Sequence, residues 1–389
     1  MTLAVRSLRI TLRACTALVL LSACADSPTE PAAGLQLQQL AAGYFHTCGL
    51  DLAGRAFCWG GNDFGTLGDG SHLQRAQPTA VGGNLIYTQL TAGAAHNCAL
   101  SANGSARCWG HNDEGQLGDG TFTDRSVPTA VSGNLAFTSV SAGHAHSCAL
   151  TADGAAYCWG DDTRGQLGNG SEGLTRSPTP VRVPFVGIWQ QVVAGYYQSC
   201  GLTTAGDAYC WGGGESGQNG DSTFNDSPEP ARVAGAHRFV RLALGDRFVC
   251  GLSNDGVWCW GANRYGELGR ASDDGANVPV RVNGITGATD ITLSMGTSTI
   301  GSAAAYACAV LSDDRLLCWG GATGVLRAAN YQPTALGGTL RARVAAAGAL
   351  HLCIIATTRT AYCGGGNSVG QLGDGTTSAR NEFVAASQP

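Results

Sequence analysis

The sequence contains no lysine, and charged residues make up only 13% of its 389 residues. Every basic side chain other than histidine is therefore arginine. The formal net charge is −5 at pH 7, and residues 1–23 contribute three arginines and no acid, so the rest of the chain carries −8. A chain this acidic is a poor candidate for binding the phosphate backbone of nucleic acids. We therefore expect no nucleic-acid partner.

The sequence also lacks a helical hydrophobic period of useful length and a set of nucleophile, base and acid that stands out. The glycine-rich segments are not followed by the lysine of a phosphate-binding P-loop, and they lack the glutamate that completes an EF-hand loop. We therefore expect no enzyme activity, no catalytic residue, no metal and no cofactor.

The sequence does contain a repeated unit of about 50 residues. The stretch that shows it best is AGHAHSCALTADGAAYCWGDDTRGQLGNG, Ala142 to Gly170. Two short strand patterns flank Ala152-Asp153-Gly154, with glycine where a positive φ is needed. This arrangement predicts a β-hairpin with a three-residue loop. Cys148 and Cys158 lie opposite each other in that hairpin, where a disulfide is within reach.

Fourteen of the sixteen cysteines form seven such pairs. Regularly spaced, even cysteine sets are typical of an oxidising compartment. The alternatives are packed free thiols or metal ligands, but the spacing is not usual for zinc. The predicted disulfides are Cys48–Cys58, Cys98–Cys108, Cys148–Cys158, Cys200–Cys210, Cys250–Cys259, Cys308–Cys318 and Cys353–Cys363.

The N-terminus has the form of an export signal. Residues 1–23 hold Arg6, Arg9 and Arg13 and then a short apolar run, Ala14–Leu21. Leu21-Ser22-Ala23-Cys24 resembles a bacterial lipobox, which implies that Cys24 is the lipid-modified first residue of the mature chain. The alternative is an ordinary signal peptide cut nearby. Residues 24–35 contain two prolines and few large apolar groups, and they are predicted to form a flexible tether.

Each repeat predicts four short strands, typified by P-T-x-V, F-x-x-V-x-A-G, H-x-C-A-L and Y-C-W-G, which favours an all-β repeat. Four strands at a period near 50, seven times over residues 36–389, resemble the regulator of chromosome condensation (RCC1) repeat family, and the resemblance rests on the motifs A-G-x-x-H-x-C-A-L, Y-C-W-G and G-x-N-x-x-G-Q-L-G-D-G. This resemblance implies a seven-bladed β-propeller of four-stranded blades. The first unit lacks a P-T-x-V strand, so we expect the C-terminal strand, Asn381–Ala385, to complete the first blade.

Three recurring residue types have structural interpretations. The tryptophans of the C-W-G motif, one in each of the first six units, are expected to fill the spaces between blades. His46, His96, His146 and His351 share one position and are expected to bond neighbouring backbone, the alternative being a central metal site. Aspartates recur at turns, as Asp69, Asp119, Asp221 and Asp374. We expect them to stabilise these turns without a bound ion, and the alternative is a calcium site.

Relatives in the resembled family imply a binding scaffold. We expect a monomer that binds an unidentified protein through loops on one face, in the bacterial cell envelope. The membrane contact is through the lipid anchor only, at the outer membrane. The alternatives are a cell-wall or carbohydrate-binding module, for which Trp189 is the side chain to inspect, and a polymer-degrading enzyme with a carboxylate pair in a central pocket. The irregular sixth unit supplies the candidate patch: Thr297, Thr299, Ile300, Thr323, Arg327 and Tyr331.

Overall fold

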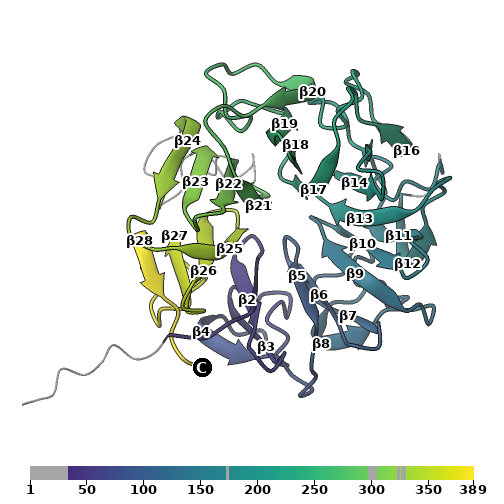
Figure 1. Ribbon diagram of the computed structural model, residues 1–389. Helices are drawn as coiled ribbons and strands as arrows, with labels where there is room; N and C mark the ends of the chain where they lie inside the picture. The colour runs from purple at the N-terminus through teal and green to yellow at the C-terminus, as the bar shows by residue number, and fades with distance from the viewer. Residues whose placement is uncertain (1–33, 172–174, 297–304, 322–324, 326–329) are drawn as a thin grey trace, which may run out of the picture. The chain divides into compact units, whose positions relative to one another are not determined.

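A computed structural model describes residues 34–171, 175–296, 305–321, 325 and 330–389, and these residues form strands and connecting loops. Twenty-eight strands form seven four-stranded antiparallel sheets, arranged as the predicted seven-bladed β-propeller (Figure 1). Within this part of the chain no helix is long and apolar enough to cross a membrane.

Each blade uses its four strands in chain order, from the centre outward. The innermost strands are β1 (Gln39–Ala42), β5 (Gln89–Ala92), β9 (Phe137–Ala142), β13 (Trp189–Ala194), β17 (Phe239–Leu244), β21 (Ala288–Leu293) and β25 (Ala342–Ala347). The second strands are β2 (His46–Leu50), β6 (His96–Leu100), β10 (His146–Thr151), β14 (Gln198–Thr203), β18 (Phe248–Ser253), β22 (Tyr306–Leu311) and β26 (His351–Ala356).

The outer half of each blade holds the other two strands. The third strands are β3 (Ala56–Gly60), β7 (Ala106–Gly110), β11 (Ala156–Asp161), β15 (Ala208–Gly212), β19 (Gly256–Gly261), β23 (Leu316–Gly320) and β27 (Ala361–Gly365). The outermost strands are β4 (Arg75–Ala80), β8 (Arg125–Ala130), β12 (Arg176–Arg182), β16 (Ser227–Arg232), β20 (Ala276–Arg281), β24 (Asn330–Leu336) and β28 (Arg380–Ala385).

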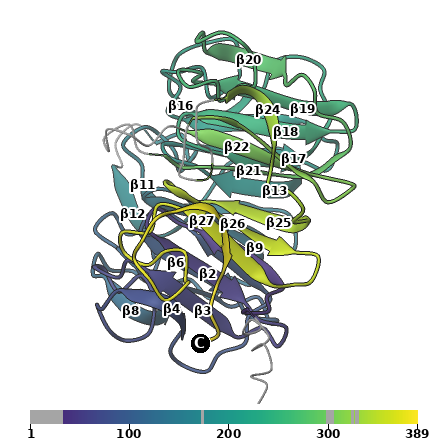
Figure 2. The same ribbon diagram turned by 90° about the vertical axis from the view of Figure 1, so that its left-hand side faces the viewer.

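The predicted closure of the ring was wrong. The C-terminal strand β28 pairs with β27 of the seventh blade (Figure 1), and the first blade is completed by its own outer strand, β4 (Figure 2). The reason is local pairing: in every blade the outermost strand folds back antiparallel onto the third strand, which directly precedes it in the chain. The blade boundary therefore lies after the P-T strand rather than before it.

The first described residues close the seam between the seventh and first blades. The Leu35 amide donates to the Ala386 carbonyl, and the Leu35 carbonyl accepts from the Ala361 amide. Leu35 is only 4% exposed. Gly34 and Leu35 therefore belong to the propeller, although the sequence analysis assigned them to the tether.

Strand direction gives the propeller two faces. The turns between first and second strands and the long loops between third and fourth strands lie on one face, which we call the loop face. The hairpins between second and third strands and the links between blades lie on the other, which we call the hairpin face. This division decides where each functional side chain lies.

The second and third strands form the predicted cysteine hairpins. Cys148 pairs directly with Cys158 across the ladder, and Gly154 takes a φ of 76° in the three-residue loop. In the fifth blade Ser253 pairs with Gly256, which leaves a two-residue loop. All seven predicted disulfides are formed, with Cα–Cα distances of 4.0 or 4.1 Å.

Candidate functional site

The innermost strands surround a central cavity of about 510 Å³. Its lining among the described residues includes no carboxylate, and its one charged residue, Arg241, pairs with Asp290 at 2.9 Å. The carboxylate pair that a polymer-degrading enzyme was expected to place there is therefore absent from this lining. Polar side chains in the cavity instead bind neighbouring strands.

Glutamines and hydroxyls of one inner strand bond the backbone of the next. The Gln89 amide group accepts from the Val140 amide at 3.0 Å and donates to the Val140 carbonyl at 3.1 Å, and Gln191 bonds Leu242 in the same way. The Thr91 hydroxyl accepts from the Ala142 amide at 3.3 Å. These polar groups therefore act as structural links between blades.

The recurring histidines bond side chains of the neighbouring blade, not its backbone as the sequence analysis expected. His96 Nε2 lies 2.8 Å from the Ser147 hydroxyl, which itself donates to the Gln116 carbonyl. The hydroxyl must therefore accept from the histidine, which fixes the Nε2–H tautomer. His46, His146 and His351 make the corresponding contacts with Asn97, Ser199 and Thr47.

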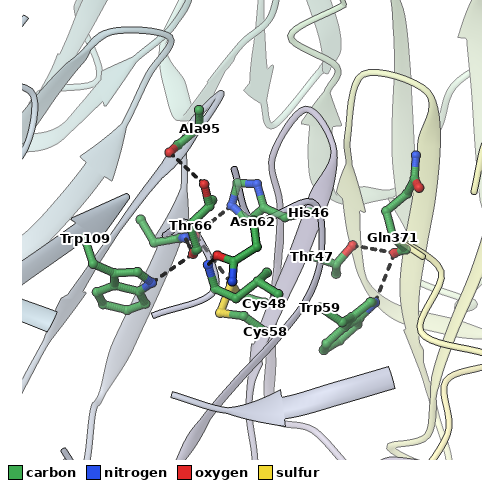
Figure 3. Close-up of a disulfide and its surroundings, with 12 residues drawn as sticks. His46, Thr47, Cys48, Cys58, Trp59, Asn62, Thr66, Ala95, Trp109 and Gln371 are labelled. Atoms are coloured by element: carbon green, nitrogen blue, oxygen red, sulfur yellow. Dashed lines mark hydrogen bonds between the residues drawn. A yellow bond between two sulfur atoms is a disulfide. The ribbon is translucent and has the colours of Figure 1, made fainter. Parts of the chain in front are cut away.

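At four seams the loop that precedes the seam accepts two hydrogen bonds at one carbonyl. Figure 3 shows Thr47 and Trp59 of the first blade both donating to the Gln371 carbonyl of the seventh, at 2.9 and 3.0 Å. The same figure shows Trp109 donating to the Thr66 carbonyl across the next seam, at 3.0 Å. All six C-W-G tryptophans are fully buried. They fill the seams, as the sequence predicted.

Burial keeps these histidines neutral. It lowers the pKa of His46 to about 4, and it lowers the pKa of both His146 and His351 to about 3. Burial also lowers the pKa of His96 well below its usual value. Each ring donates through Nε2, and the buried Nδ1 atoms of His96, His146 and His351 have no hydrogen-bond partner in the described chain. The histidine positions are therefore latches between blades, and Tyr306 and Phe248 replace them in two blades.

Turn side chains from several blades meet over the loop-face end of the central cavity. Tyr44 of the first blade lies 5.6 Å from His144 of the third, measured between ring centroids, and His144 stacks on Tyr196 of the fourth at 4.1 Å. Tyr44 also packs with Met295 and Ala349 in a buried cluster. Burial raises the pKa of Tyr44 well above its usual range, so its hydroxyl stays protonated. The cluster covers this end of the cavity.

The long loops between third and fourth strands combine recurring positions with a variable one. The Asn62 side chain accepts from the Leu67 amide at 2.8 Å and donates to the Leu73 carbonyl at 3.0 Å, so it holds its own loop together. Two residues further on, the repeats differ in size, charge and polarity. That position holds Phe64, Glu114, Arg164, Ser216, Tyr265 and Val369.

Charged side chains connect the third, fourth and fifth blades across the loop face. Arg164 lies 3.2 Å from both Glu215 and Asp226, and Arg247 lies 3.1 Å from the other oxygen of Glu215. The Arg164 guanidinium also lies over the Tyr197 ring at 5.8 Å. Arg164, Glu215 and Arg247 do not recur at equivalent positions in the other blades, whereas Asp226 has an equivalent in Asp124 of the second blade.

Two acidic residues that depart from the repeat line one cavity of about 220 Å³ beside this network. Glu267 stands where four other repeats have glutamine, and Asp246 stands where others have tyrosine, histidine or alanine. Burial raises the pKa of Glu267 to about 7 and that of Asp246 to about 6. Arg247 and Arg264 line the same cavity. Sequence reasoning missed this pair, although both residues were visible as departures from the repeat.

The two faces differ in charge. We assign each charged residue within a strand to the face at the nearer end of that strand. The loop face of the described chain then carries eighteen carboxylates and eight arginines. The hairpin face carries eleven arginines against seven carboxylates. The acidity of the chain is therefore concentrated on the loop face.

The predicted patch is only partly described. Tyr331 is the second residue of β24, on the loop face, and is 37% exposed, and the carboxylate of Asp273 beside it raises the pKa of its hydroxyl. Thr297, Thr299, Ile300, Thr323 and Arg327 lie outside the described residues.

Two alternatives from the sequence gain no structural support. Trp189 is only 3% exposed and stacks on Phe185 at 3.9 Å, so it offers no platform for a sugar. The turn carboxylate of Asp69 accepts from Ser71 and pairs with Arg75 at 3.0 Å, and Asp119 and Asp374 make the same type of contacts. The described residues contain no cluster of acidic, histidine or cysteine side chains suited to a metal ion.

Comparisons with known proteins agree with this architecture. Human WBSCR16 shares the fold with a TM-score of 0.76 and 19% identity, over 86% of this chain and 94% of that one. Prp20p from Saccharomyces cerevisiae matches with a TM-score of 0.69 and 20% identity, over 79% of this chain and 80% of that one.

Among curated proteins, human E3 ubiquitin-protein ligase HERC2 is 30% identical over 215 residues. The match covers 51% of this chain and only 4% of that much longer protein. A family model of the RCC1-like domain matches residues 20–326. The chain therefore belongs to the RCC1-like domain family.

Proposed function

We propose that this protein is an exported, lipid-anchored propeller scaffold that binds another protein through its loop face, without catalysing a reaction. One observation carries the proposal. The loop-face position of Phe64, Arg164 and Tyr265 carries a different residue in each of the six blades where it is described, while six of the seven blades have the tryptophan that bonds the preceding blade.

The charge of the loop face suggests the kind of partner. Eighteen carboxylates against eight arginines favour a partner with a basic surface, because complementary charge steers association and suppresses wrong partners. Exposed aromatic rings such as Phe64 and Tyr331, at 39% and 37% exposure, can supply anchor contacts at the centre of an interface.

Proteins of similar fold support a binding role by analogy. The structure of yeast Prp20p was described together with its binding to Gsp1p and histones, and yeast RCC1 (Prp20) was solved bound to Kap60. Identity near 20% carries the fold and not those partners. The site of anchoring that we propose is Cys24, at the bacterial outer membrane.

Site-specific photo-cross-linking in the native envelope tests the proposal. A photoreactive residue is placed at Arg164 or Tyr265 on the loop face and, as the matched control, at exposed Leu52 or Val240 on the hairpin face. We expect one protein adduct of constant mass from the loop-face positions only. Equal adducts from both faces, or none from the loop face, would refute the assignment.

A charge test follows from the same proposal. Asp63→Asn, Asp113→Asn and Asp274→Asn together remove three exposed loop-face carboxylates. We expect a lower yield of the adduct and a weaker dependence of that yield on salt, because rim charges act mainly on the association rate. Removal of three hairpin-face carboxylates, Asp153, Asp255 and Asp313, is the matched control and should leave the adduct unchanged.

A further inference from the structure

The hairpin face presents arginines and apolar tips around the place where the propeller joins its N-terminal segment. Gly34, the first described residue, accepts from the Gln388 side chain, and the Leu37 amide donates to the Arg359 carbonyl. The segment 34–38 therefore lies between the hairpin 357–360 of the seventh blade and the hairpin 51–55 of the first. With the links 83–87 and 341–343, these segments form what we call the N-terminal arc.

Arginines outnumber acidic residues along this arc and along the neighbouring hairpin of the sixth blade, which holds Asp313, Asp314 and Arg315. Arg55 pairs with Asp51 and Arg315 pairs with Asp313, each at 2.6 Å. The exposed side chains of Arg341, Arg343 and Arg359 make no ion pair among the described residues, and Asp314 is the one further carboxylate of these segments. The arc therefore presents an excess of positive charge to solvent.

The position of Arg359 is costly for an arginine. It takes a φ of 68° at the hairpin position where four other repeats have glycine: Gly54, Gly104, Gly154 and Gly206. The left-handed region is unfavourable for a residue with a Cβ atom, and such strain is found at functional positions more often than elsewhere. Arg359 therefore places positive charge at a hairpin tip beside the segment 34–38.

Apolar side chains flank the arginines. Leu52 at the tip of the first hairpin is 57% exposed, and Ile86 in the following link is 53% exposed. The Arg55–Ile86 bridge holds this link against the hairpin. Arginines beside exposed aliphatic tips match the interface of an anionic bilayer, where headgroups attract the cations and the acyl boundary accepts the apolar groups.

We propose that the N-terminal arc docks on an anionic lipid bilayer, so that the hairpin face lies on the membrane and the acidic loop face points away from it. This orientation rests on the proposed anchoring at Cys24, but the lipid affinity of the arc does not. A basic surface adds a second membrane contact to that of a lipid anchor and orients the anchored domain. The same arrangement leaves the loop face free for a protein partner.

Vesicle binding tests the arc. The full chain with Cys24→Ser, which lacks the predicted acylation site, is mixed with vesicles of phosphatidylcholine alone or with 30% phosphatidylglycerol, a composition on the order of anionic membranes. The leader, with Arg6, Arg9 and Arg13, is the same in the parent and in every variant, so it contributes equally to each. We expect tighter binding to the anionic vesicles, and a loss of that difference as salt screens it.

Two triple variants locate the surface. Arg341→Gln, Arg343→Gln and Arg359→Gln together should weaken binding to anionic vesicles about 100-fold, at roughly five-fold for each arginine. Arg164→Gln, Arg247→Gln and Arg264→Gln on the loop face remove equal charge and should leave it unchanged. Equal binding to both vesicle types, or equal loss in both variants, would overturn the proposal. Thermal unfolding checks that each variant is folded, and cross-linking from Arg164 reports the partner interaction independently.

Discussion

His351 of the seventh blade and Thr47 of the first are joined across the seam where the two ends of the propeller meet. His351 Nε2 lies 2.8 Å from the Thr47 hydroxyl, which donates in turn to the Gln371 carbonyl. Both residues are fully buried or nearly so. The same latch recurs at other seams, so the last seam is closed by the same chemistry as those formed earlier along the chain.

Thr47→Val should weaken that last seam. The substitution keeps the shape of the side chain but leaves the buried His351 Nε2–H without its acceptor, at a cost of about 1–3 kcal/mol. We expect this loss in the free energy of unfolding, measured in urea. Thr129→Val on outer strand β8, whose hydroxyl bonds only the nearby Val127 carbonyl, is the control and should cost less. Equal costs would mean that the latch adds nothing.

The buried histidines should make the fold sensitive to acid. The pKa of His146 is about 3 in the folded chain and its usual value is 6.5, so between these values the unfolded state binds the additional proton. The stabilisation is complete above pH 6.5 and is lost progressively as pH falls toward 3. Each such histidine contributes up to about 1.4 kcal/mol per pH unit in that window.

His146→Gln tests this effect, because Gln198 occupies the same position in the fourth blade and donates to the Gly245 carbonyl at 3.1 Å. At pH 8 we expect the variant to be about as stable as the parent, and between pH 6.5 and 4 we expect it to lose less stability. Chemical denaturation at each pH measures the free energy of unfolding. His72→Gln, at an exposed loop, is the control. Parallel pH profiles for parent and His146→Gln would contradict the assignment.

Glu267 should have the opposite dependence. Burial raises its folded pKa to about 7, so its charged form penalises the fold, and the contribution to stability falls as pH rises from 4.5 through 7. Glu267→Gln restores the residue found in four other repeats and should stabilise the protein by about 1–3 kcal/mol at pH 8, with little effect at pH 4. A constant difference at both pH values would exclude titration as its cause.

The seam tryptophans should be the most sensitive positions of the core. Trp159 is fully buried, donates to the Gln116 carbonyl at 2.9 Å and packs near Phe137. Trp159→Ala should cost about 3–5 kcal/mol in the free energy of unfolding. Trp258, which is only partly buried on the same kind of strand, should cost clearly less when changed to alanine. A similar cost at both sites would argue against the seam as the source.

One disulfide can be removed with little change in packing volume. Cys148→Ala with Cys158→Ala opens a loop with a sequence separation of 10 and should cost about 2–3 kcal/mol, chiefly through the unfolded chain. The six other disulfides stay in place, so parent and variant are compared by chemical denaturation without reductant. A loss much larger than this would indicate a disturbed hairpin.

Local features of the chain were predictable because short-range geometry decides them. Cys148 and Cys158 are opposed whenever a three-residue loop joins their strands, and the buried Trp159 follows from its repeated position. The closure was not predictable in this way. A periodic strand order is the same wherever the unit is cut, so only the pairing of Arg380–Ala385 with β27 distinguishes the two possibilities.

The functional surfaces depended on the arrangement of blades in space. Asp246 and Glu267 are 21 residues apart in sequence and meet only because a turn and a loop share one face. The partners of the histidines were also missed, since Ser147 lies in the repeat after His96. A repeat-by-repeat comparison of polar departures would have found the acids, but not the cavity they share.

Complete four-stranded blades have a consequence for the order of assembly. Because no strand is borrowed from a distant part of the chain, each blade can finish its sheet and oxidise its cysteine pair as soon as its own segment has been made. Only one contact surface, between the earliest and the latest blade, has to wait for the C-terminus. The protein can thus mature stepwise, with a single final act of ring closure.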